Sequence, residues 1–544
     1  MRQDGATGRG RAQDCPCLPD LYCSPYASPD LRKTMSNGDI LKRPQRTSAV
    51  IFLVVTLVYF YSAVRYARHA PLWMDEVLTY YTIRQADLSH VLRAVWSGTD
   101  FSPFFMHAVL HVIPPVDQGD LLSPRILSIF SAYGAALCLL RLARKYFELP
   151  VAVLSFSLLL ASYFFFFAVQ AREYALIVFL FSASLLVWSN VCDGNNDRKN
   201  LFLLWVFLSL TLCTHFYGVV SIIVMALCET VWDLRTRRIR WPVWITLAAT
   251  CPVGMAWIPW ARHLQMLNAG DQNGPFYYAY PTFEKLWSYT VLFMGGNYVF
   301  PIIAVSCLAA SFLFPGSGDV PPENAQAGRR VLGCIVLSVG CVPLIVFCLA
   351  RFLTGSFSAR YMADFLTFDA VAIPFAIGWT RRATLFSMLM CPALACMIVL
   401  YSADDTMDLS SVRSLQAIPS GLPVVIGEGL LFIELQQKIY RPFSRHAVYL
   451  YGLENVPNVD RTNEHAIRYL HKVVPWMRVS QFDDFLRDNH HFYVLSRNPA
   501  TEDYVSPALR QRGVLCRTAF RDADVTVFEA GTDCKRMVPA VSGH

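Results

Sequence analysis

The sequence predicts an α-helical polytopic membrane protein with a small α/β domain at its C-terminal end, and three observations support this fold class. The 544 residues are 54% hydrophobic and only 16% charged, whereas a soluble domain carries about a quarter charged residues. Several apolar runs reach the roughly 18–20 residues that are needed to cross a bilayer. After residue 402, the long apolar runs give way to short stretches of strand and helix character.

The apolar runs predict about eleven membrane spans, all within residues 48–402, the transmembrane domain. They are expected at 48–66, 124–143, 149–167, 173–190, 200–214, 217–233, 241–260, 287–313, 331–352, 361–379 and 383–401. The polar residues 1–47 precede the first span and are expected to form a disordered cytoplasmic segment. The first span then serves as a signal anchor, and Met35 is an alternative start of the chain.

Clusters of basic residues predict how these spans are oriented. Lys and Arg concentrate at the ends of apolar runs, for example at Arg141 and Arg144 and at Arg235 to Arg240. With the N-terminus inside, these clusters lie on the cytoplasmic side, as the positive-inside rule requires. The net charge of +7 is therefore explained by orientation, and no nucleic-acid partner is predicted.

This orientation makes residues 67–123 one large outer loop and leaves residues 403–544 outside, on the periplasmic or extracellular side. The apolar piece 103–113 is too short to span and is expected to be an interfacial helix. In the C-terminal part, predicted strands in "GLPVVIGEG", "HAVYLYG", "HHFYVLS" and "DVTVFEA" alternate with predicted helices in "FIELQQKIY" and "EHAIRYLHKVV". This alternation indicates a small α/β domain. Its Cys516 and Cys534 are candidates for a disulfide in an oxidising compartment.

Polar residues collect beside the membrane in the predicted outer loops. The stretch "HAPLWMDEVLTYY" (69–81) holds two adjacent carboxylates, Asp75 and Glu76. Further candidates follow in three short motifs: Arg172 and Tyr174 in "VQAREYAL", His215 in "THFYG", and Arg360 and Tyr361 in "SARYMADF". Because charged residues at membrane depth are costly and usually functional, we expect one site on the outer face.

These residue types suit glycosyl transfer from a lipid-linked phosphate. The guanidinium groups of Arg172 and Arg360 offer forked donors to a phosphate and never lose their charge. A carboxylate such as Asp75 can deprotonate an acceptor hydroxyl beside an oxocarbenium-like centre. Structural roles are the alternative: carboxylates favour a helix N-terminus, interfacial arginines reach for headgroups, and tyrosines populate the aromatic belt.

The order of these motifs resembles that of the GT-C glycosyltransferases, in particular the group with protein O-mannosyltransferases and lipid A aminoarabinose transferases. The resemblance covers residues 48 to 400 and rests on "LWMDEVLTYY", "DFSPFFMHAVLHVI", "SPRILSIFSAYGAALCLLRLARKYF", "VQAREYALIVFL", "THFYG" and "ARYMADFLTFDAVAIPFAIG". It implies an inverting membrane transferase that moves a sugar from a polyprenyl-phosphate donor to a lipid, glycan or protein acceptor. One departure is Phe101-Ser102-Pro103, where the family often has His-Pro-Pro.

The resemblance also implies a role for each candidate. Asp75 becomes the general base and Glu76 its catalytic neighbour. The other candidates would bind substrate: Arg172 and Arg360 at the donor phosphate, and Tyr174, His215 and Tyr361 in the walls of the pocket. No cofactor is identified, and dependence on a divalent metal stays open because His107 and His111, four residues apart, have no evident third ligand.

Two other classes of function stay open at this point. A transporter or flippase of lipid-linked glycans would also need outer-facing arginines, and should contain two related halves with broken helices. A non-catalytic envelope assembly protein would use the α/β domain and would not need Asp75. For the favoured transferase, the expected location is a bacterial inner membrane.

Overall fold

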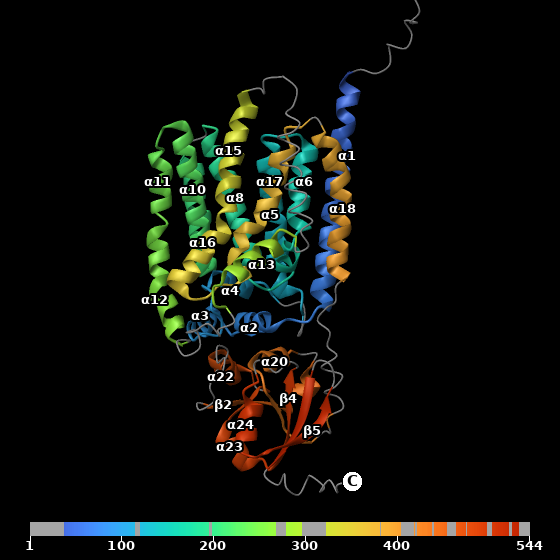
Figure 1. Cartoon of the computed structure of the whole chain (residues 1–544), viewed down its shortest axis with the longest axis vertical. Coiled ribbons are helices and arrows are strands. Elements are labelled where there is room, and N and C mark those ends of the chain that lie inside the picture. Colours follow the sequence, from blue (N-terminus) through green and yellow to red (C-terminus); the bar gives the residue numbers. More distant parts are fainter. Residues whose placement is uncertain are drawn as a thin grey trace, which may run out of the picture.

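A helical bundle and a C-terminal α/β domain make up the protein, and the short helices α2 (Met74–Ile83) and α3 (Leu88–Trp96) lie between them (Figure 1). The computed structural model describes residues 37–114, 120–194, 198–267, 279–295, 323–380, 382–403, 418, 421–437, 440–453, 464–474, 476–497, 503–521 and 525–531. Everything below concerns these residues.

The bundle contains α1 and the helices from α4 to α18. Their bounds are α1 (Asn37–His69), α4 (Phe105–Val112), α5 (Ile126–Arg144), α6 (Leu149–Leu160), α7 (Phe164–Ala168), α8 (Tyr174–Cys192), α9 (Arg198–Thr214), α10 (Val219–Thr236), α11 (Trp241–Ala248), α12 (Cys251–Leu267), α13 (Phe283–Phe293), α15 (Glu323–Gly340), α16 (Val342–Leu349), α17 (Thr367–Ile377) and α18 (Ala383–Ala403). Short helical segments join some of them: η2 (Ser123–Arg125), η3 (Phe216–Gly218), the π-helical η4 (Ala350–Thr354) and η5 (Ala359–Leu366).

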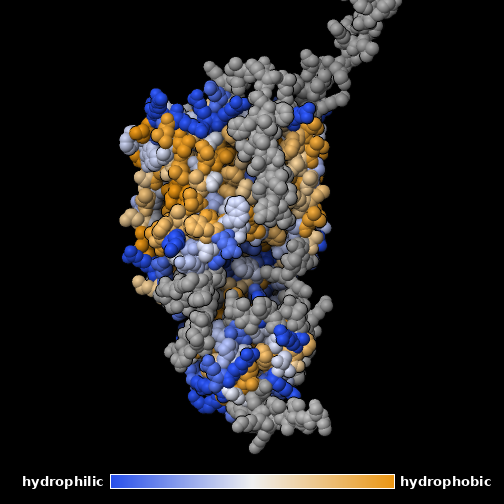
Figure 2. Space-filling model, in the orientation of Figure 1, coloured by the Kyte–Doolittle hydropathy of each residue, from blue (hydrophilic) through white to orange (hydrophobic). Residues whose placement is uncertain are grey.

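The polytopic membrane class is confirmed. Among the described residues, 7 helices are long and apolar enough to cross a membrane, and apolar side chains cover the sides of the bundle (Figure 2). Hydrophilic side chains gather at the end of the bundle away from the α/β domain. Basic residues occupy the last turns of α5 (Arg141, Arg144) and α10 (Arg235). The exact number of spans stays a prediction.

Several predicted spans are interrupted in the structure. The predicted span 149–167 is divided into α6 and α7, and 241–260 into α11 and α12. Between α6 and α7, the Ser162 hydroxyl donates to the Leu159 carbonyl and accepts from the Phe164 N–H. Such side-chain bonds compete with the helical ladder and end it locally.

The bounds of other predicted segments also differ from the structure. The first helix, α1, begins at Asn37, earlier than the predicted start at residue 48. The short helix expected within 103–113 is α4. Only the beginning of the predicted span 287–313 is described, as the end of α13, and the rest lies outside the described residues.

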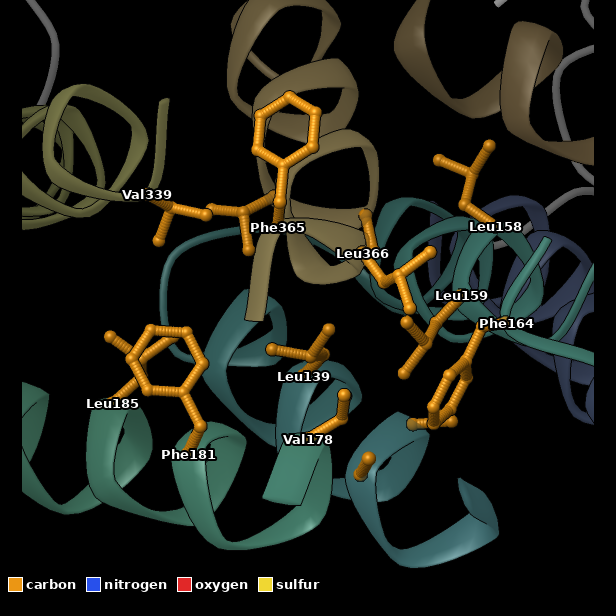
Figure 3. Packing of buried hydrophobic residues seen from close by; sticks show 14 of the residues in the cluster. Leu139, Leu158, Leu159, Phe164, Val178, Phe181, Leu185, Val339, Phe365 and Leu366 are labelled. Carbon is orange, nitrogen blue, oxygen red and sulfur yellow. The ribbon is translucent and has the colours of Figure 1, made fainter. Parts of the chain in front are cut away.

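One large apolar core holds the bundle together. Figure 3 shows how side chains from several elements meet in it, including Leu139 of α5, Phe164 of α7, Phe181 of α8 and Phe365 of η5. Each of these four side chains is at least nine-tenths buried. Because lipid provides no hydrophobic driving force between helices, close packing of this kind is what joins them.

The α/β domain is a six-stranded sheet in the order β3-β2-β1-β4-β6-β5. Its strands are β1 (Val424–Ile426), β2 (Ala447–Tyr451), β3 (Arg478–Gln481), β4 (His491–Arg497), β5 (Leu515–Arg521) and β6 (Val525–Gly531), and its helices are α20 (Gly429–Glu434), α21 (Arg441–Ser444), α22 (Glu464–Val473), α23 (Phe482–Asp488) and α24 (Val505–Gln511). Strands β3, β2, β1 and β4 are parallel, and β6 and β5 are antiparallel to their neighbours. Val425 lies at the centre, opposite Val448 of β2 and Val494 of β4.

The predicted α/β domain is confirmed as a class, and its four predicted strands correspond to β1, β2, β4 and β6. The sequence analysis missed β3 and β5, which are the two edge strands. Edge strands have one open side and tolerate polar residues, so "RVSQ" and "LCRTAFR" lack a clear apolar pattern. The predicted boundary at 402 falls at the end of α18 and stays a prediction. The proposed disulfide involves Cys534, which lies outside the described residues.

Candidate active site

The two adjacent carboxylates lie in the first turn of α2, at the end of the bundle that faces the α/β domain. This is the end of a helix at which a negative charge is favourable. Glu76 accepts the backbone N–H of Trp73 at 3.2 Å and so caps the helix that carries it. The local sequence therefore explains why both acids stand here, while their surroundings separate their roles.

Glu76 forms a buried ion pair with Arg125, and both side chains are 1% exposed. The ion pair is bidentate: Arg125 Nε is 2.8 Å from Glu76 Oε1, and Arg125 Nη2 is 2.7 Å from Glu76 Oε2. Glu76 Oε1 also accepts the backbone N–H of Ala171 at 2.6 Å. The guanidinium donates further to backbone carbonyls near the end of α1: Ala67, Ala70 and Pro71. Glu76 and Arg125 thus join α1, α2, η2 and the loop before α8.

Asp75 is paired differently, with Arg360 of η5. Arg360 Nη1 lies 2.5 Å from Asp75 Oδ2, and the two side chains are 25% and 12% exposed. Arg360 is also 5.9 Å from the ring centroid of Tyr361. Of the two acids, Asp75 is therefore the more exposed one, and its partner Arg360 is a quarter exposed.

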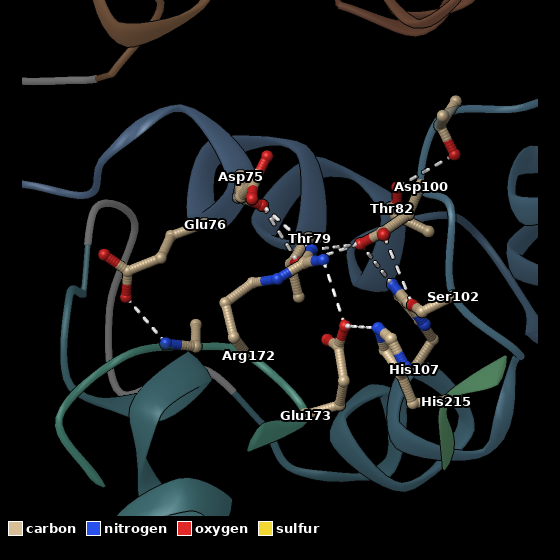
Figure 4. A network of polar contacts seen from close by, with 12 residues as sticks. Asp75, Glu76, Thr79, Thr82, Asp100, Ser102, His107, Arg172, Glu173 and His215 are labelled. Atoms are coloured by element: carbon tan, nitrogen blue, oxygen red, sulfur yellow. Dashed lines mark hydrogen bonds and ion pairs between the residues drawn. The ribbon is translucent and has the colours of Figure 1, made fainter. Parts of the chain in front are cut away.

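Arg172 organises a second cluster of charges beside Asp75 (Figure 4). Its Nη1 donates to Asp100 Oδ2 at 2.5 Å and to Thr79 Oγ1 at 3.1 Å, and its Nη2 donates to Glu173 Oε1 at 3.2 Å. Arg172 is 6% exposed and Glu173 is 1% exposed. The guanidinium is thus committed to side chains of the protein itself.

Asp100 is the acceptor at the centre of this cluster. It receives hydrogen bonds from Thr79 at 3.2 Å, from Ser102 at 3.2 Å and from His107 Nε2 at 3.1 Å, besides the one from Arg172. Burial alone would raise the pKa of Asp100, but Arg172 and His107 hold it well below its usual range. Asp100 is therefore a carboxylate, and its charge is balanced by Arg172.

The two histidines of α4 have different partners. His107 bonds to Asp100, whereas His111 Nδ1 lies 2.9 Å from the Ile83 carbonyl. Among the described residues, no three or more His, Cys, Asp or Glu side chains form a group that could hold a metal ion. Whether this protein depends on a metal stays open.

His215 occupies the turn between α9 and α10 and is neutral. Its Nδ1 accepts the backbone N–H of Tyr217 at 3.0 Å, so the proton is on Nε2, which points at Glu173 Oε1 at 3.6 Å. Burial, together with the positive charges of Arg172 and Arg360, lowers the pKa of His215 to about 3. The turn needs Gly218, because a Cβ there would be 2.4 Å from the Thr211 carbonyl oxygen.

Aromatic rings line the same region. Tyr361 stacks on Tyr217 with ring centroids 4.1 Å apart and planes at 6°. Tyr174 is 2% exposed, and its centroid is 6.1 Å from that of His215. Tyr217 is anchored in turn, since its hydroxyl donates to the Ser356 carbonyl at 2.9 Å. Both predicted tyrosines thus have their rings near His215, since the Tyr361 centroid is 5.8 Å from that of His215.

The structure brings all seven predicted site residues into one network of contacts at the α2 end of the bundle. Their roles in catalysis and binding stay predictions. Three residues outside the predicted set have central positions: Arg125, Asp100 and His107. A signal for two of them is visible in the sequence, since Arg125 is a lone arginine at the start of an apolar run and Asp100 stands in an otherwise uncharged stretch, "WSGTDFSPFF".

We expect Glu76→Gln to destabilise the protein by about 3–5 kcal/mol, because breaking a buried ion pair leaves Arg125 with an uncompensated charge. Asp75→Asn makes the same chemical change one residue earlier, in the more exposed Asp75–Arg360 pair. It should lower the free energy of unfolding by at most about 1 kcal/mol. The measurement is the apparent melting temperature of both variants in detergent. Equal melting temperatures would contradict the assignment of Glu76 as the structural acid.

His215 should make the protein less stable as the medium becomes acidic. An unfolded histidine titrates near pH 6.5, whereas folded His215 takes up its proton only near pH 3. Below about pH 6.5 the unfolded chain therefore binds the additional proton, and stability falls with pH, by about 2 kcal/mol at about pH 5.

His215→Asn tests this expectation because the amide oxygen can still accept the Tyr217 N–H. The apparent melting temperature of this variant should fall less than that of the wild type between about pH 7 and about pH 5. His69→Gln, a change at an exposed histidine, is the control and should retain the wild-type slope. An unchanged slope in His215→Asn would show that other groups cause the loss.

No protein-family model matches the chain, and no curated protein sequence matches it. Solved structures do resemble it. ArnT from Cupriavidus metallidurans, bound to undecaprenyl phosphate, aligns at a TM-score of 0.52 and 13% identity, covering 89% of this chain and 98% of ArnT.

Two further structures are similar at lower scores. ArnT in the apo state has a TM-score of 0.44 at 16% identity, covering 88% of this chain and 97% of ArnT. The oligosaccharyltransferase AglB from Archaeoglobus fulgidus, in complex with an inhibitory peptide and a dolichol-phosphate, also has 0.44, at 10% identity, covering 83% of this chain and 69% of AglB. The alignment with undecaprenyl-phosphate-bound ArnT spans both the bundle and the α/β domain, and the chain therefore shares the fold of that ArnT structure.

Proposed function

We propose that the protein is an integral-membrane glycosyltransferase, which moves a sugar from a polyprenyl-phosphate-linked donor to an acceptor hydroxyl with Asp75 as general base. The observation that carries the proposal is the partly exposed Asp75–Arg360 pair, with a distance of 2.5 Å, in a chain that folds like ArnT bound to undecaprenyl phosphate. A base and a phosphate-binding cation stand side by side, as transfer from a phosphate requires.

Arg360 is the favoured partner of the donor phosphate. Its guanidinium is a quarter exposed and comes from a short helical segment at the end of the bundle. Arg172 is buried and already bonded to Asp100, Thr79 and Glu173, so it contributes positive potential and positions these groups. A phosphate that binds Arg360 competes with Asp75 and frees the Asp75 oxygens for the acceptor.

The reaction then follows from this exchange of partners. The acceptor hydroxyl gives its proton to Asp75, and its oxygen forms a bond to the anomeric carbon of the donor sugar. The bond between that carbon and the phosphate oxygen breaks, and its electron pair stays on the polyprenyl phosphate, whose charge Arg360 stabilises. Attack from the face opposite the leaving group inverts the anomeric centre.

The remaining predicted residues shape the site around this pair. Glu76 is a positioning residue, because its ion pair with Arg125 fixes the first turn of α2. His215 is neutral and contacts Glu173 and the rings of Tyr174 and Tyr361. The α2 end of the bundle is assigned to the outer side of the membrane, since the basic last turns of α5 and α10 are at the other end.

Asp75→Asn should lower sugar transfer at least about 100-fold, because the amide cannot accept the proton of the acceptor. The assay uses detergent-solubilised enzyme, radiolabelled sugars on undecaprenyl phosphate, and an envelope extract as the source of acceptors. Asp87→Asn is the matched control: Asp87 caps α3 from an exposed position, and asparagine caps equally well. Near-normal transfer by Asp75→Asn would refute this residue as the base.

Arg360→Gln should weaken binding of undecaprenyl phosphate on the order of 10-fold, because a charge-assisted hydrogen bond to the phosphate is lost. Binding is measured by the thermal stabilisation of the detergent-solubilised protein at increasing lipid concentration. Arg93→Gln, an exposed arginine on α3, is the control and should bind as the wild type does. Equal affinities in both variants would remove Arg360 from the donor site.

The transfer assay, together with a transport assay in sealed vesicles, separates the proposed function from its two rivals. Movement of lipid-linked sugar across vesicles without transfer would identify a transporter. If the protein shows neither sugar transfer nor transport with any prenyl-phosphate sugar, the result favours a non-catalytic assembly protein that acts through its α/β domain.

A further inference from the structure

The α/β domain is attached to the helix that carries Asp75. Gln437, just after α20, makes two hydrogen bonds to the backbone of a single residue, Leu72. The Leu72 N–H donates to Gln437 Oε1 at 2.7 Å, and Gln437 Nε2 donates to the Leu72 carbonyl at 2.6 Å. Gln437 is 5% exposed. A buried side chain of the α/β domain thus pairs with the backbone three residues before Asp75, much as a neighbouring strand would.

A second bond holds the other end of the same helix. The Tyr81 hydroxyl donates to the Gln436 carbonyl at 2.7 Å. Between these two bonds, Val77 and Leu78 of α2 are buried in the hydrophobic core of the α/β domain, together with residues such as Phe432. Helix α2 therefore belongs to the core of the α/β domain on one of its sides (Figure 1).

On its other side, α2 is held by the bundle. Glu76 pairs with Arg125, and Thr79 bonds to Asp100 and accepts from Arg172. These groups are all buried. The position of Asp75 relative to Arg360 of the bundle thus depends on two sets of contacts, one from each part of the protein.

We propose that Gln437 is a positioning residue for Asp75, so that the α/β domain completes the catalytic unit and is more than a separate acceptor-binding module. Gln437 fixes the backbone at Leu72, where the chain enters α2, and thereby sets the first turn that carries Asp75. This inference rests on the proposed function for its catalytic meaning. The contacts through which the α/β domain holds α2 do not depend on the proposed function.

Hydrogen–deuterium exchange of the full chain in detergent tests the coupling without any substrate. In Gln437→Leu, exchange in peptides that cover residues 70–80 should be faster on the order of 10-fold, because the Leu72 N–H loses its acceptor and the turn loses its anchor. Gln437→Glu keeps an acceptor for the Leu72 N–H and repels its carbonyl, so an intermediate increase is expected.

Gln436→Leu is the matched control. The Gln436 side chain is equally buried and donates to the Phe432 carbonyl within its own domain, while its bond to Tyr81 uses the backbone. Exchange at residues 70–80 should stay at the wild-type rate in this variant. If Gln437→Leu and Gln437→Glu also keep the wild-type rate, or if Gln436→Leu raises it equally, the proposal is overturned.

Transfer kinetics give the second readout. Gln437→Leu should lower kcat about 10-fold and leave the KM values for donor and acceptor within about twofold, because a displaced base affects the chemical step. An unchanged kcat with a raised acceptor KM would overturn the proposal in favour of a separate acceptor-binding module. If the wild type transfers no sugar, the proposed function fails, while the exchange data still decide whether Gln437 couples the domain to α2.

Discussion

The buried ion pair between Glu76 and Arg125 is the interaction on which the geometry of this site depends. Two charges that are both 1% exposed can exist only if they face each other and if their remaining hydrogen-bonding positions are filled. Here these positions are filled by backbone groups from α1 and from the loop before α8. The need to satisfy one buried pair therefore fixes the relative positions of several separate segments of the chain.

The same requirement explains why the charges next to the pair form a network. Arg172, Asp100 and His107 neutralise and bond one another in the buried layer beneath α2, and His215 stays neutral within it. The Arg360 side chain is the more accessible partner of the other pair, at 25% exposed, and the Asp75 side chain is 12% exposed. A buried layer of ion pairs and hydrogen bonds thus supports the Asp75–Arg360 pair, and in the proposed reaction such preorganised support would hold the base in place.

The position of α2 between the two parts of the protein gives the α/β domain a structural role at the site. Val77 and Leu78 pack in the hydrophobic core of the domain, and Gln437 of the domain makes two hydrogen bonds to the backbone of Leu72. The bundle supplies the ionic contacts on the opposite side. A helix that is shared in this way cannot move with one part without disturbing the other, so a movement of the α/β domain relative to the bundle would displace the first turn that carries Asp75.

The sequence by itself determined the class of this fold, and it predicted seven of the residues that meet at the α2 end of the bundle. Hydropathy and length are summed along the chain, so they identify membrane helices, and the central strands of the α/β domain carry enough β-branched residues to be recognised. Interruptions such as the one at Ser162 depend on single side-chain bonds, and the edge strands β3 and β5 lack an apolar pattern. Neither could be located by periodicity.

Only the tertiary structure decided which acid has which surroundings. Asp75 and Glu76 are adjacent and chemically alike, and nothing in their local sequence distinguishes an exposed pair from a buried one. The difference comes from Arg360 and Arg125, which are far away along the chain and reach α2 from opposite sides. The same holds for the bonds from Gln437 to Leu72, since contacts between residues so distant in sequence are set by packing, which no local pattern encodes.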